Sequence, residues 1–201
     1  MSKFPYPENP APTDASIISA IKRRWSTVAF SSEPIEEEKM KVLFEALRWT
    51  QSSRNEQPWR IIYATHDDTE NFDRLVSILA EGNQAYAKNA YLLLLACAIP
   101  NHEYKNKPNW THQYDTGAAM HSIFLQATEL NLVGHEMEGF DKEAAHTVIG
   151  VPAEVVPMAM MAIGYPGDEE ALSEDLKPRQ ETGKRERKET PEIFYKGKWQ
   201  E

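Results

Sequence analysis

Cysteine and long apolar runs are scarce in this sequence. The single cysteine, Cys97, allows no intrachain disulfide, and its place inside an apolar run predicts a buried structural thiol in a reducing compartment. That run, residues 92–99, is as long as a strand and far shorter than the roughly 18 apolar residues of a membrane span. The N-terminal residues 1–13 are rich in proline and contain no apolar signal core. These absences predict a cytoplasmic protein that does not enter a membrane.

Positive charge is also in short supply. The 22 Lys and Arg residues face 31 Asp and Glu residues, so the formal net charge is -9. This balance argues against nucleic acid or a membrane surface as a partner of the whole molecule. With 201 residues, of which 41% are hydrophobic, the chain is long enough for one globular domain with a substantial core.

Several familiar site motifs are missing. No Gly-x-Gly-x-x-Gly follows an expected strand, and neither Gly-x-x-x-x-Gly-Lys-Ser/Thr nor Gly-x-Ser-x-Gly occurs. A Rossmann dinucleotide site, a P-loop and a hydrolase nucleophile elbow are therefore not indicated. His102 and His112 lie ten residues apart, but no carboxylate or cysteine completes a metal-binding spacing, so no metal is expected.

Helical periodicity and apolar runs alternate along the chain. Strands are expected at 59–65, 91–99 and 155–165, and short polar connections at 83–86 and 134–140. Helices are expected at 16–24, from Glu33-Pro34-Ile35 to about residue 50, after Asp67 or Asp68, from Tyr114 to Asn131, and after Asp141. Helices interleaved with about three strands predict a layered α+β or α/β domain.

Residues 52–59 are the first candidate binding segment. Two serines, two amide side chains and a tryptophan are crowded between a periodic helix and an apolar strand. Loops held by rigid flanking elements often carry function. The alternative is an ordinary polar connection.

Basic residues gather in two places. Lys22, Arg23 and Arg24 end the first helix, where they either complement the helix dipole or form an anion site. The second cluster holds six cations between residues 177 and 188, and its alternative is a solvated tail. Beyond it, four large apolar groups indicate that the end of the chain docks on something: Ile193, Phe194, Tyr195 and Trp199. Two arginine clusters and polar loops suit a phosphate joined to a heterocycle, such as flavin mononucleotide, with other nucleotides left open.

The long segment 100–113 is polar and contains Trp110 and His112. A connection of that length is either disordered or a functional lid.

Four ordered motifs resemble those of the nitroreductase family of FMN-dependent oxidoreductases. The likeness spans roughly residues 16–199 and rests on Arg23-Arg24-Trp25-Ser26-Thr27-Val28-Ala29-Phe30, Ser52-Ser53-x-Asn55-x-Gln57-Pro58-Trp59, Met137-Glu138-Gly139-Phe140 and Arg185-x-Arg187. The resemblance implies an α+β, three-layer fold in which helices flank a central, mainly antiparallel sheet. It implies a single FMN-binding domain (16–201) in an intertwined homodimer with shared active sites, and the proline-rich N-terminus is expected to form an extended arm (1–15). Residues 100–113 would then be the lid, and 177–201 an extension that packs on the partner.

The same resemblance implies the cofactor-binding residues. The phosphate and ribityl chain would lie near Arg23, Arg24, Trp25, Ser26, Arg185 and Arg187. The partner subunit would contribute Ser52, Ser53, Asn55 and Gln57. Asn83 would meet the pyrimidine edge, and backbone amides of the turn Met137, Glu138 and Gly139 would face N5, the atom that exchanges hydride. Trp110, His112 and Tyr114 are candidates for the acceptor pocket, and His135 is a weaker one.

The implied activity is ping-pong hydride transfer from NADH or NADPH to a nitroaromatic, quinone or enone. A flavin-binding storage or regulatory protein with little turnover is the alternative, and an FMN-dependent dehydrogenase would use the same site. Two departures favour the alternative: Val28 stands where many family members have Lys or Arg, and Tyr86 stands where some have Lys near the ring. Such cations stabilise the anionic reduced flavin, and Arg54 is a candidate replacement.

Overall fold

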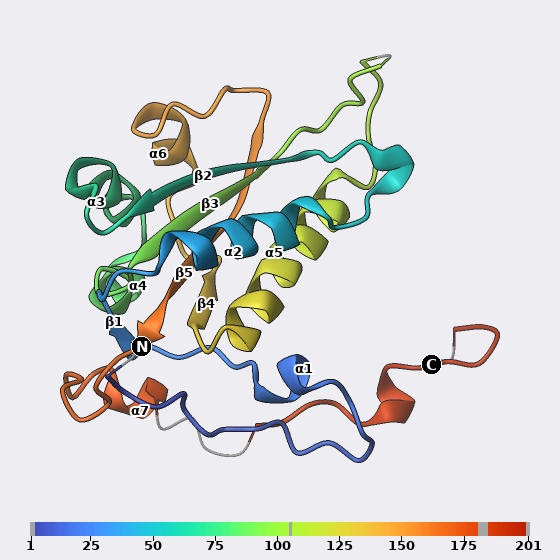
Figure 1. The fold of residues 1–201 in the computed structure, drawn as a ribbon. Helices are drawn as coiled ribbons and strands as arrows, with labels where there is room; N and C mark the ends of the chain where they lie inside the picture. The colour runs from blue at the N-terminus through green and yellow to red at the C-terminus, as the bar shows by residue number, and fades with distance from the viewer. Residues whose placement is uncertain (1–2, 105, 181–184, 200–201) are drawn as a thin grey trace.

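The fold is built on a five-stranded sheet, seen in the computed structural model of residues 3–104, 106–180 and 185–199 (Figure 1). The strands are β1 (Phe30–Ser31), β2 (Trp59–Thr65), β3 (Leu92–Ala98), β4 (Val133–Met137) and β5 (Val156–Pro166). The order β1-β5-β3-β2 is completed by β4, which also pairs with β5. Every strand pair is antiparallel.

Strand β3 divides the core into two halves because successive side chains point to opposite faces. Leu93, Leu95 and Cys97 enter one apolar cluster, whereas the alternate residues enter the other: Leu92, Leu94 and Ala96. The first cluster is covered by α3 (Thr69–Ser77), α4 (Glu81–Ala87) and α6 (Lys142–Thr147). The second is covered by α2 (Glu37–Arg48) and α5 (His112–Glu129). The predicted three-layer α+β fold with a mainly antiparallel sheet is thereby confirmed.

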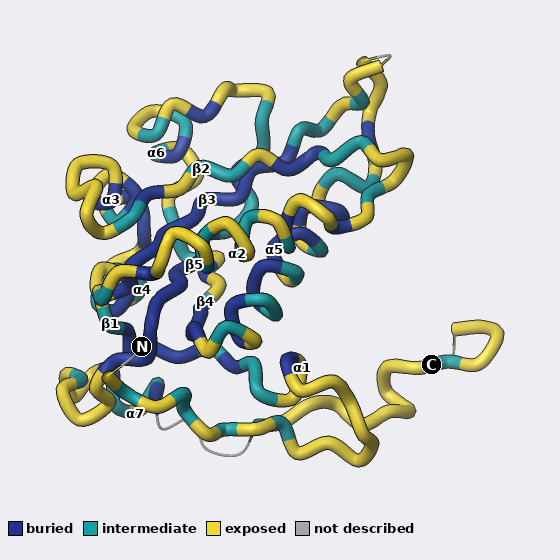
Figure 2. The backbone as a smooth tube through the Cα atoms, in the orientation of Figure 1, coloured by how far each residue is buried: buried dark blue, intermediate teal, exposed yellow. Residues whose placement is uncertain are grey.

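The shorter elements lie at the periphery. They are α1 (Ser19–Arg23), α7 (Lys177–Gln180) and two 3-10 turns, η1 (Ser53–Asn55) and η2 (Thr190–Glu192). The N-terminal arm passes one end of the sheet, where Tyr6 packs against the first apolar cluster, and residues 185–199 run beside part of the arm before projecting away from it (Figures 1 and 2). The arm is tied to this segment by Arg185, whose Nη1 donates to the Asn9 carbonyl at 2.6 Å.

Two segments predicted as connections belong to regular elements. Residues 83–86 lie inside α4, where Gln84 Nε2 donates to the Leu79 carbonyl at 2.7 Å and helps close the first turn. Residues 134–137 form most of β4, because pairing with buried β5 outweighs the low strand propensity of Gly134. Gly134 is needed there for packing: a Cβ would lie 2.8 Å from the Phe124 ring.

The helix boundaries also differ from the predicted ones. The first helix is only five residues long, and α2 begins at Glu37, after Pro34 rather than at it. Helix α5 begins at His112, two residues before the predicted start at Tyr114. Among the residues described here, no helix combines the length and apolar character needed to cross a membrane.

Candidate functional site

Three arginines converge where α1 ends. Arg24 follows the helix directly, and the C-terminal segment brings Arg185 and Arg187 beside it. Burial lowers the pKa of the Arg24 guanidinium, and the nearby charge of Arg187 lowers it further. The pKa of Arg185 is lowered by burial first and then by both neighbours. None of the ion pairs formed within the described ranges includes any of the three. Such a cluster is suited to an anion.

The three guanidinium groups make different contacts. Arg185 is a clamp: Nη2 donates to the Arg24 carbonyl at 2.7 Å, and Nη1 donates to the Asn9 and Lys22 carbonyls at 2.6 and 3.2 Å. Arg187 donates to the carbonyl of the adjacent Glu186 at 2.7 Å. Arg24 lies over the Phe124 ring with its Cζ 5.0 Å from the centroid.

The other predicted residues of the first motif are engaged elsewhere. Arg23 donates to Asn131 Oδ1 at 2.5 Å and lies over the Tyr6 ring, 4.5 Å from the centroid. Trp25 is buried in the core, with no hydrogen-bond partner for Nε1 among the described residues. Ser26 forms an isolated bridge with Gly134 of β4, which holds this segment against the sheet.

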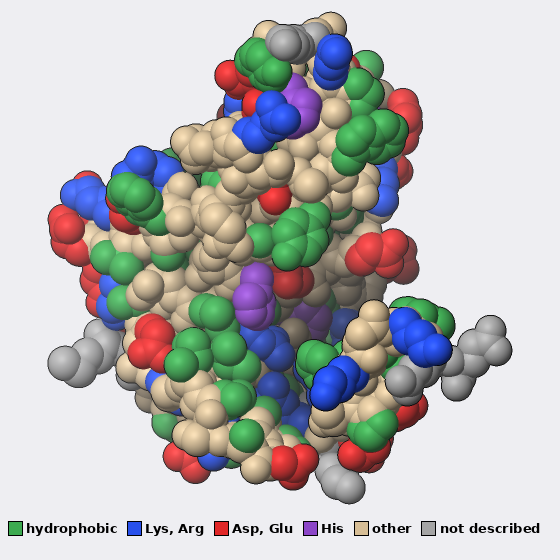
Figure 3. Space-filling model, turned by 90° about the vertical axis from the view of Figure 1, so that its right-hand side faces the viewer, with side chains coloured by type: hydrophobic (Ala, Val, Ile, Leu, Met, Phe, Trp, Pro, Cys, Tyr) green, Lys and Arg blue, Asp and Glu red, His purple; other side chains and the backbone are tan. Residues whose placement is uncertain are grey.

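Figure 3 shows a hollow on the face that is turned by 90° from the view of Figure 1. Lys and Arg side chains lie inside the hollow, and His and acidic side chains lie beside it. The α5 residue His121 has its pKa lowered by burial and by Arg24. Glu136, on β4, is exposed to solvent in this chain. The surrounding protein still raises the pKa of its carboxyl by desolvation, and the positive charge of Arg24 opposes that rise. Sequence reasoning missed both residues because only the fold brings them to Arg24.

Asn83 and Gly139, from the predicted pyrimidine-edge and N5 groups, are in direct contact. Asn83 Nδ2 donates to the Gly139 carbonyl at 2.9 Å, and Asn83 Oδ1 accepts from the Tyr86 hydroxyl at 3.0 Å. A Cβ on Gly139 would lie 2.8 Å from Asn83 Nδ2, so a larger residue here would displace the Asn83 amide. The exposed Glu138 precedes it, immediately after Met137 ends β4.

The loop of residues 52–57 has an unusual backbone. Arg54, Asn55 and Gln57 have φ values of 55°, 57° and 48°, in the left-handed region that side chains other than glycine rarely adopt. Ser52 Oγ braces the loop by accepting from the Gln57 backbone N–H at 2.9 Å. Ser53 and Asn55 are exposed. Strained backbone of this kind is typical of functional loops.

A buried carboxylate anchors this loop. Asp115, in the first turn of α5 and 4% exposed, accepts from the Ser53 N–H at 3.1 Å and from Thr111 Oγ1 at 2.9 Å. Because Arg24 contacts Phe124, nine residues further along α5, loop and arginines are separated by roughly 14 Å of helix. Within one chain, the two halves of the predicted site therefore do not meet.

The candidate acceptor residues lie near the loop. Trp110 and Tyr114 are 90% and 76% exposed, and His112 Nδ1 is 2.7 Å from the Asn109 carbonyl. His135 lies elsewhere, packed on the Tyr86 ring with Nδ1 2.8 Å from the Thr27 carbonyl. Burial, the largest influence, lowers the pKa of His135 and favours a neutral imidazole.

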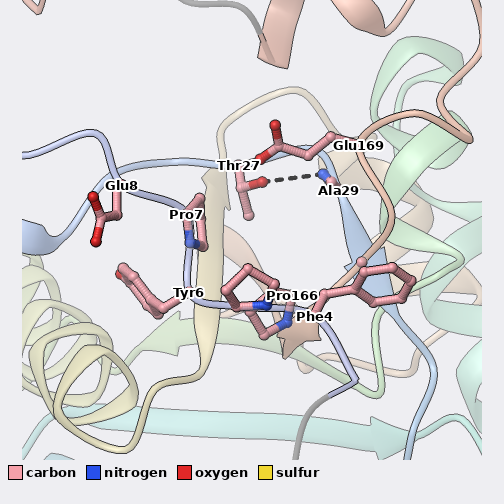
Figure 4. A pocket seen from close by; sticks show the side chains of 10 residues that line it. Phe4, Tyr6, Pro7, Glu8, Thr27, Ala29, Pro166 and Glu169 are labelled. Atoms are coloured by element: carbon pink, nitrogen blue, oxygen red, sulfur yellow. Dashed lines mark hydrogen bonds between the residues drawn. The ribbon is translucent and has the colours of Figure 1, made fainter.

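A cavity of about 470 Å³ lies beneath the N-terminal arm. Figure 4 shows Tyr6, Pro7 and Glu8 on the left, Thr27, Ala29 and Glu169 at the top, and Phe4 beside Pro166 at the bottom. Its lining has two carboxylates, no Lys or Arg and no predicted cofactor-binding residue, so it is unsuited to a phosphate.

The model of the nitroreductase family matches residues 21–94 and 66–165 of this chain. The chain belongs to the nitroreductase family. A solved structure described as an oxidoreductase containing FMN is 30% identical, with a TM-score of 0.87, and the match covers 94% of this chain and 96% of that one. A nitroreductase family protein of Clostridium difficile 630 has the same fold at 21% identity, with a TM-score of 0.70 and coverage of 92% and 100%. An Archaeoglobus fulgidus protein, whose name proposes an NADH dehydrogenase or NAD(P)H nitroreductase, is 26% identical over 78% of this chain and 89% of its own length.

Proposed function

We propose that this nitroreductase-family protein is an FMN-dependent oxidoreductase that uses NADH or NADPH to reduce a small acceptor of the nitroaromatic, quinone or enone class. The observation that carries this proposal is the convergence of Arg24, Arg185 and Arg187 without an acidic ion-pair partner in the described residues. Family membership and the 30% identity to an FMN-containing oxidoreductase support it.

The donor groups fit the chemistry of FMN. A phosphate would relieve the mutual repulsion of the three guanidinium groups through charge-assisted hydrogen bonds. Asn83 offers an amide beside Gly139, which suits the donor and acceptor pattern of a pyrimidine ring. Arg23 adds a further guanidinium next to Arg24, since its partner Asn131 is neutral, while Trp25 is buried and Ser26 is bridged to β4.

When bound, FMN would supply hydride transfer, accepting hydride from NAD(P)H and passing it to the acceptor. The residues of the chain would bind FMN and orient its ring. In this proposal the arginines hold the phosphate, Asn83 fixes the ring edge, and backbone N–H groups near Glu138 and Gly139 face the reacting edge. The protein provides position and electrostatics, and no side chain is assigned a proton-transfer role.

A second copy of the chain completes the site in this proposal. Since the loop and the arginines lie at opposite ends of α5, Ser52, Ser53, Asn55 and Gln57 serve the partner's cofactor. Trp110, His112 and Tyr114 are near the same loop and would line the acceptor side. The homodimer is proposed to act in the cytoplasm.

A flavin carrier with little turnover is the second candidate. It is favoured by the absence of a cation at positions 28 and 86, which are occupied by the buried Val28 and Tyr86.

Anaerobic mixing tests the proposal. The protein is loaded with FMN and mixed with NADH or NADPH, and flavin absorbance should bleach within the mixing time course. Adding a nitroaromatic, a quinone or an enone should restore it. If the protein takes up FMN but the flavin absorbance does not bleach, the reductase proposal is wrong and the flavin carrier is supported. If the protein does not take up FMN, both candidates are overturned.

A further inference from the structure

The C-terminal helix α7 brings a cation to the two positions where the sequence lacks one. Arg179 lies over the Tyr86 ring, with its Cζ 4.8 Å from the centroid. Its Nη1 donates to the carbonyl of Gly82 at 2.7 Å. Gly82 immediately precedes Asn83, so this guanidinium is fixed next to the proposed pyrimidine-edge residue.

The neighbouring Gln180 fixes α7 on the other side. This side chain is buried, and its Oε1 accepts from Thr27 Oγ1 and from the Val28 backbone N–H, both at 2.9 Å. Its Nε2 donates to Glu169 Oε1 at 2.7 Å, so this carboxylate already has a hydrogen-bond partner. Arg179 forms no ion pair within the described part of the chain. Its charge is therefore held in place without being neutralised.

Neither residue at the two departing positions can carry charge. Val28 is apolar, and burial raises the pKa of Tyr86, whose hydroxyl donates to Asn83 Oδ1. Arg54, the candidate from sequence, is exposed on η1, which is tied to the first turn of α5, and in the proposed shared site it would face the partner's cofactor.

We propose that Arg179 supplies the positive charge at the pyrimidine edge of the flavin, in place of the cations missing at positions 28 and 86. The inference rests on the proposed function. A hydride carries two electrons and one proton, so its addition leaves the ring with one extra negative charge at this edge. A nearby guanidinium favours the reduced cofactor over the oxidised one. Arg179 is thus a positioning and tuning residue whose effect is electrostatic.

The test is the midpoint potential of bound FMN, measured by anaerobic dye-coupled reduction of the FMN-loaded protein. Arg179→Gln keeps a long polar side chain and removes the charge, whereas Arg179→Lys keeps the charge. We expect Arg179→Gln to lose about tenfold in its preference for reduced over oxidised FMN, a shift of about 30 mV for a two-electron couple. Arg179→Lys should stay within about threefold of the parent protein.

Two further variants sharpen the result. Arg74→Gln alters a surface arginine paired with Glu70 at 2.5 Å and should leave the potential unchanged. Arg54→Gln should also leave it unchanged. An unchanged potential in Arg179→Gln, an equal fall in Arg179→Lys, or a fall in Arg54→Gln alone would each overturn the inference. FMN uptake is measured first: no uptake by the parent protein overturns the proposed function as well, whereas uptake with an unchanged potential overturns this inference only.

Discussion

Arg24 has charged neighbours of both signs, and the balance between them governs which ligand can bind beside it. Arg187 and Arg185 add positive charge, His121 is biased towards the neutral form, and Glu136 is the titratable acid that faces Arg24. A bound phosphate and the Glu136 carboxylate would compete for the same guanidinium.

This competition predicts a pH effect on FMN affinity. Because the pKa of Glu136 is raised, its carboxyl stays neutral to a higher pH than an ordinary glutamate. As pH rises through that pKa, the new negative charge weakens phosphate binding. Glu136→Gln should therefore bind FMN about two- to fivefold more tightly at pH 8 and equally well at low pH. The measurement is the FMN dissociation constant of the parent protein divided by that of Glu136→Gln at each pH. Titration of the FMN phosphate affects both constants equally and cancels in this ratio.

Glu129→Gln, on the exposed end of α5, is the matched control, and it should bind FMN as tightly as the parent protein at every pH. A constant ratio for Glu136→Gln across the pH range would contradict the assignment of Glu136.

At the scale of elements, the loop of residues 52–57 and the first turn of α5 form one unit. Three left-handed residues other than glycine cost free energy, of order 1–3 kcal/mol each for most residue types and less for asparagine. The Ser52 brace and the Asp115 acceptor hold the loop in this form before any ligand arrives.

Removing the acceptor should loosen the loop. We expect Asp115→Ala to weaken FMN binding about tenfold, since hydrogen bonds to charged groups contribute about 1.5–3 kcal/mol. Asp115→Asn retains an acceptor oxygen and should recover most of the affinity. Fluorescence quenching of FMN measures binding, and the melting temperature of the FMN-free protein reports separately on stability.

Ser122→Ala, two turns further along the same helix, removes the hydroxyl that accepts from Thr50 and should change stability without changing FMN affinity. Wild-type affinity in Asp115→Ala would show that the loop does not depend on this carboxylate.

The same elements show what a sequence can reveal. The apolar stripe of α2 and the continuous run of β3 are local patterns, and both were predicted. Strand β4 was not, because its strand character comes from pairing with β5 and its glycine packs on Phe124. Arg179 could not be found either, since 97 residues separate it from its partner Gly82. The cofactor motifs were predictable as short patterns, while the residues that support them are brought together only by the fold.

At the scale of the whole molecule, several large apolar side chains have no cover. Ile18, at the N-cap of α1, is 62% exposed, and Phe194 and Trp199, on the projecting C-terminal segment (Figures 1 and 2), are 72% and 78% exposed. Exposed apolar groups at this density are typical of an interface.

We expect the protein to have the mass of a dimer in solution. Phe194→Asp should shift the mass towards that of the monomer and reduce FMN occupancy in parallel, because charge is costly in an apolar interface. Val148→Asp, on the C-cap of α6, is the matched control and should do neither. Light scattering and flavin absorbance measure the two effects, and a monomeric parent protein with full FMN occupancy would exclude the shared site.

The separation of loop and arginines along α5 has a genetic consequence. If each site draws on two chains, a chain with a damaged loop and a chain with a damaged Arg24 can complement each other. In the mixed dimer, one site collects both defects and the other collects none. Two inactive alleles would then restore part of the activity when expressed together, although neither encodes a working protein.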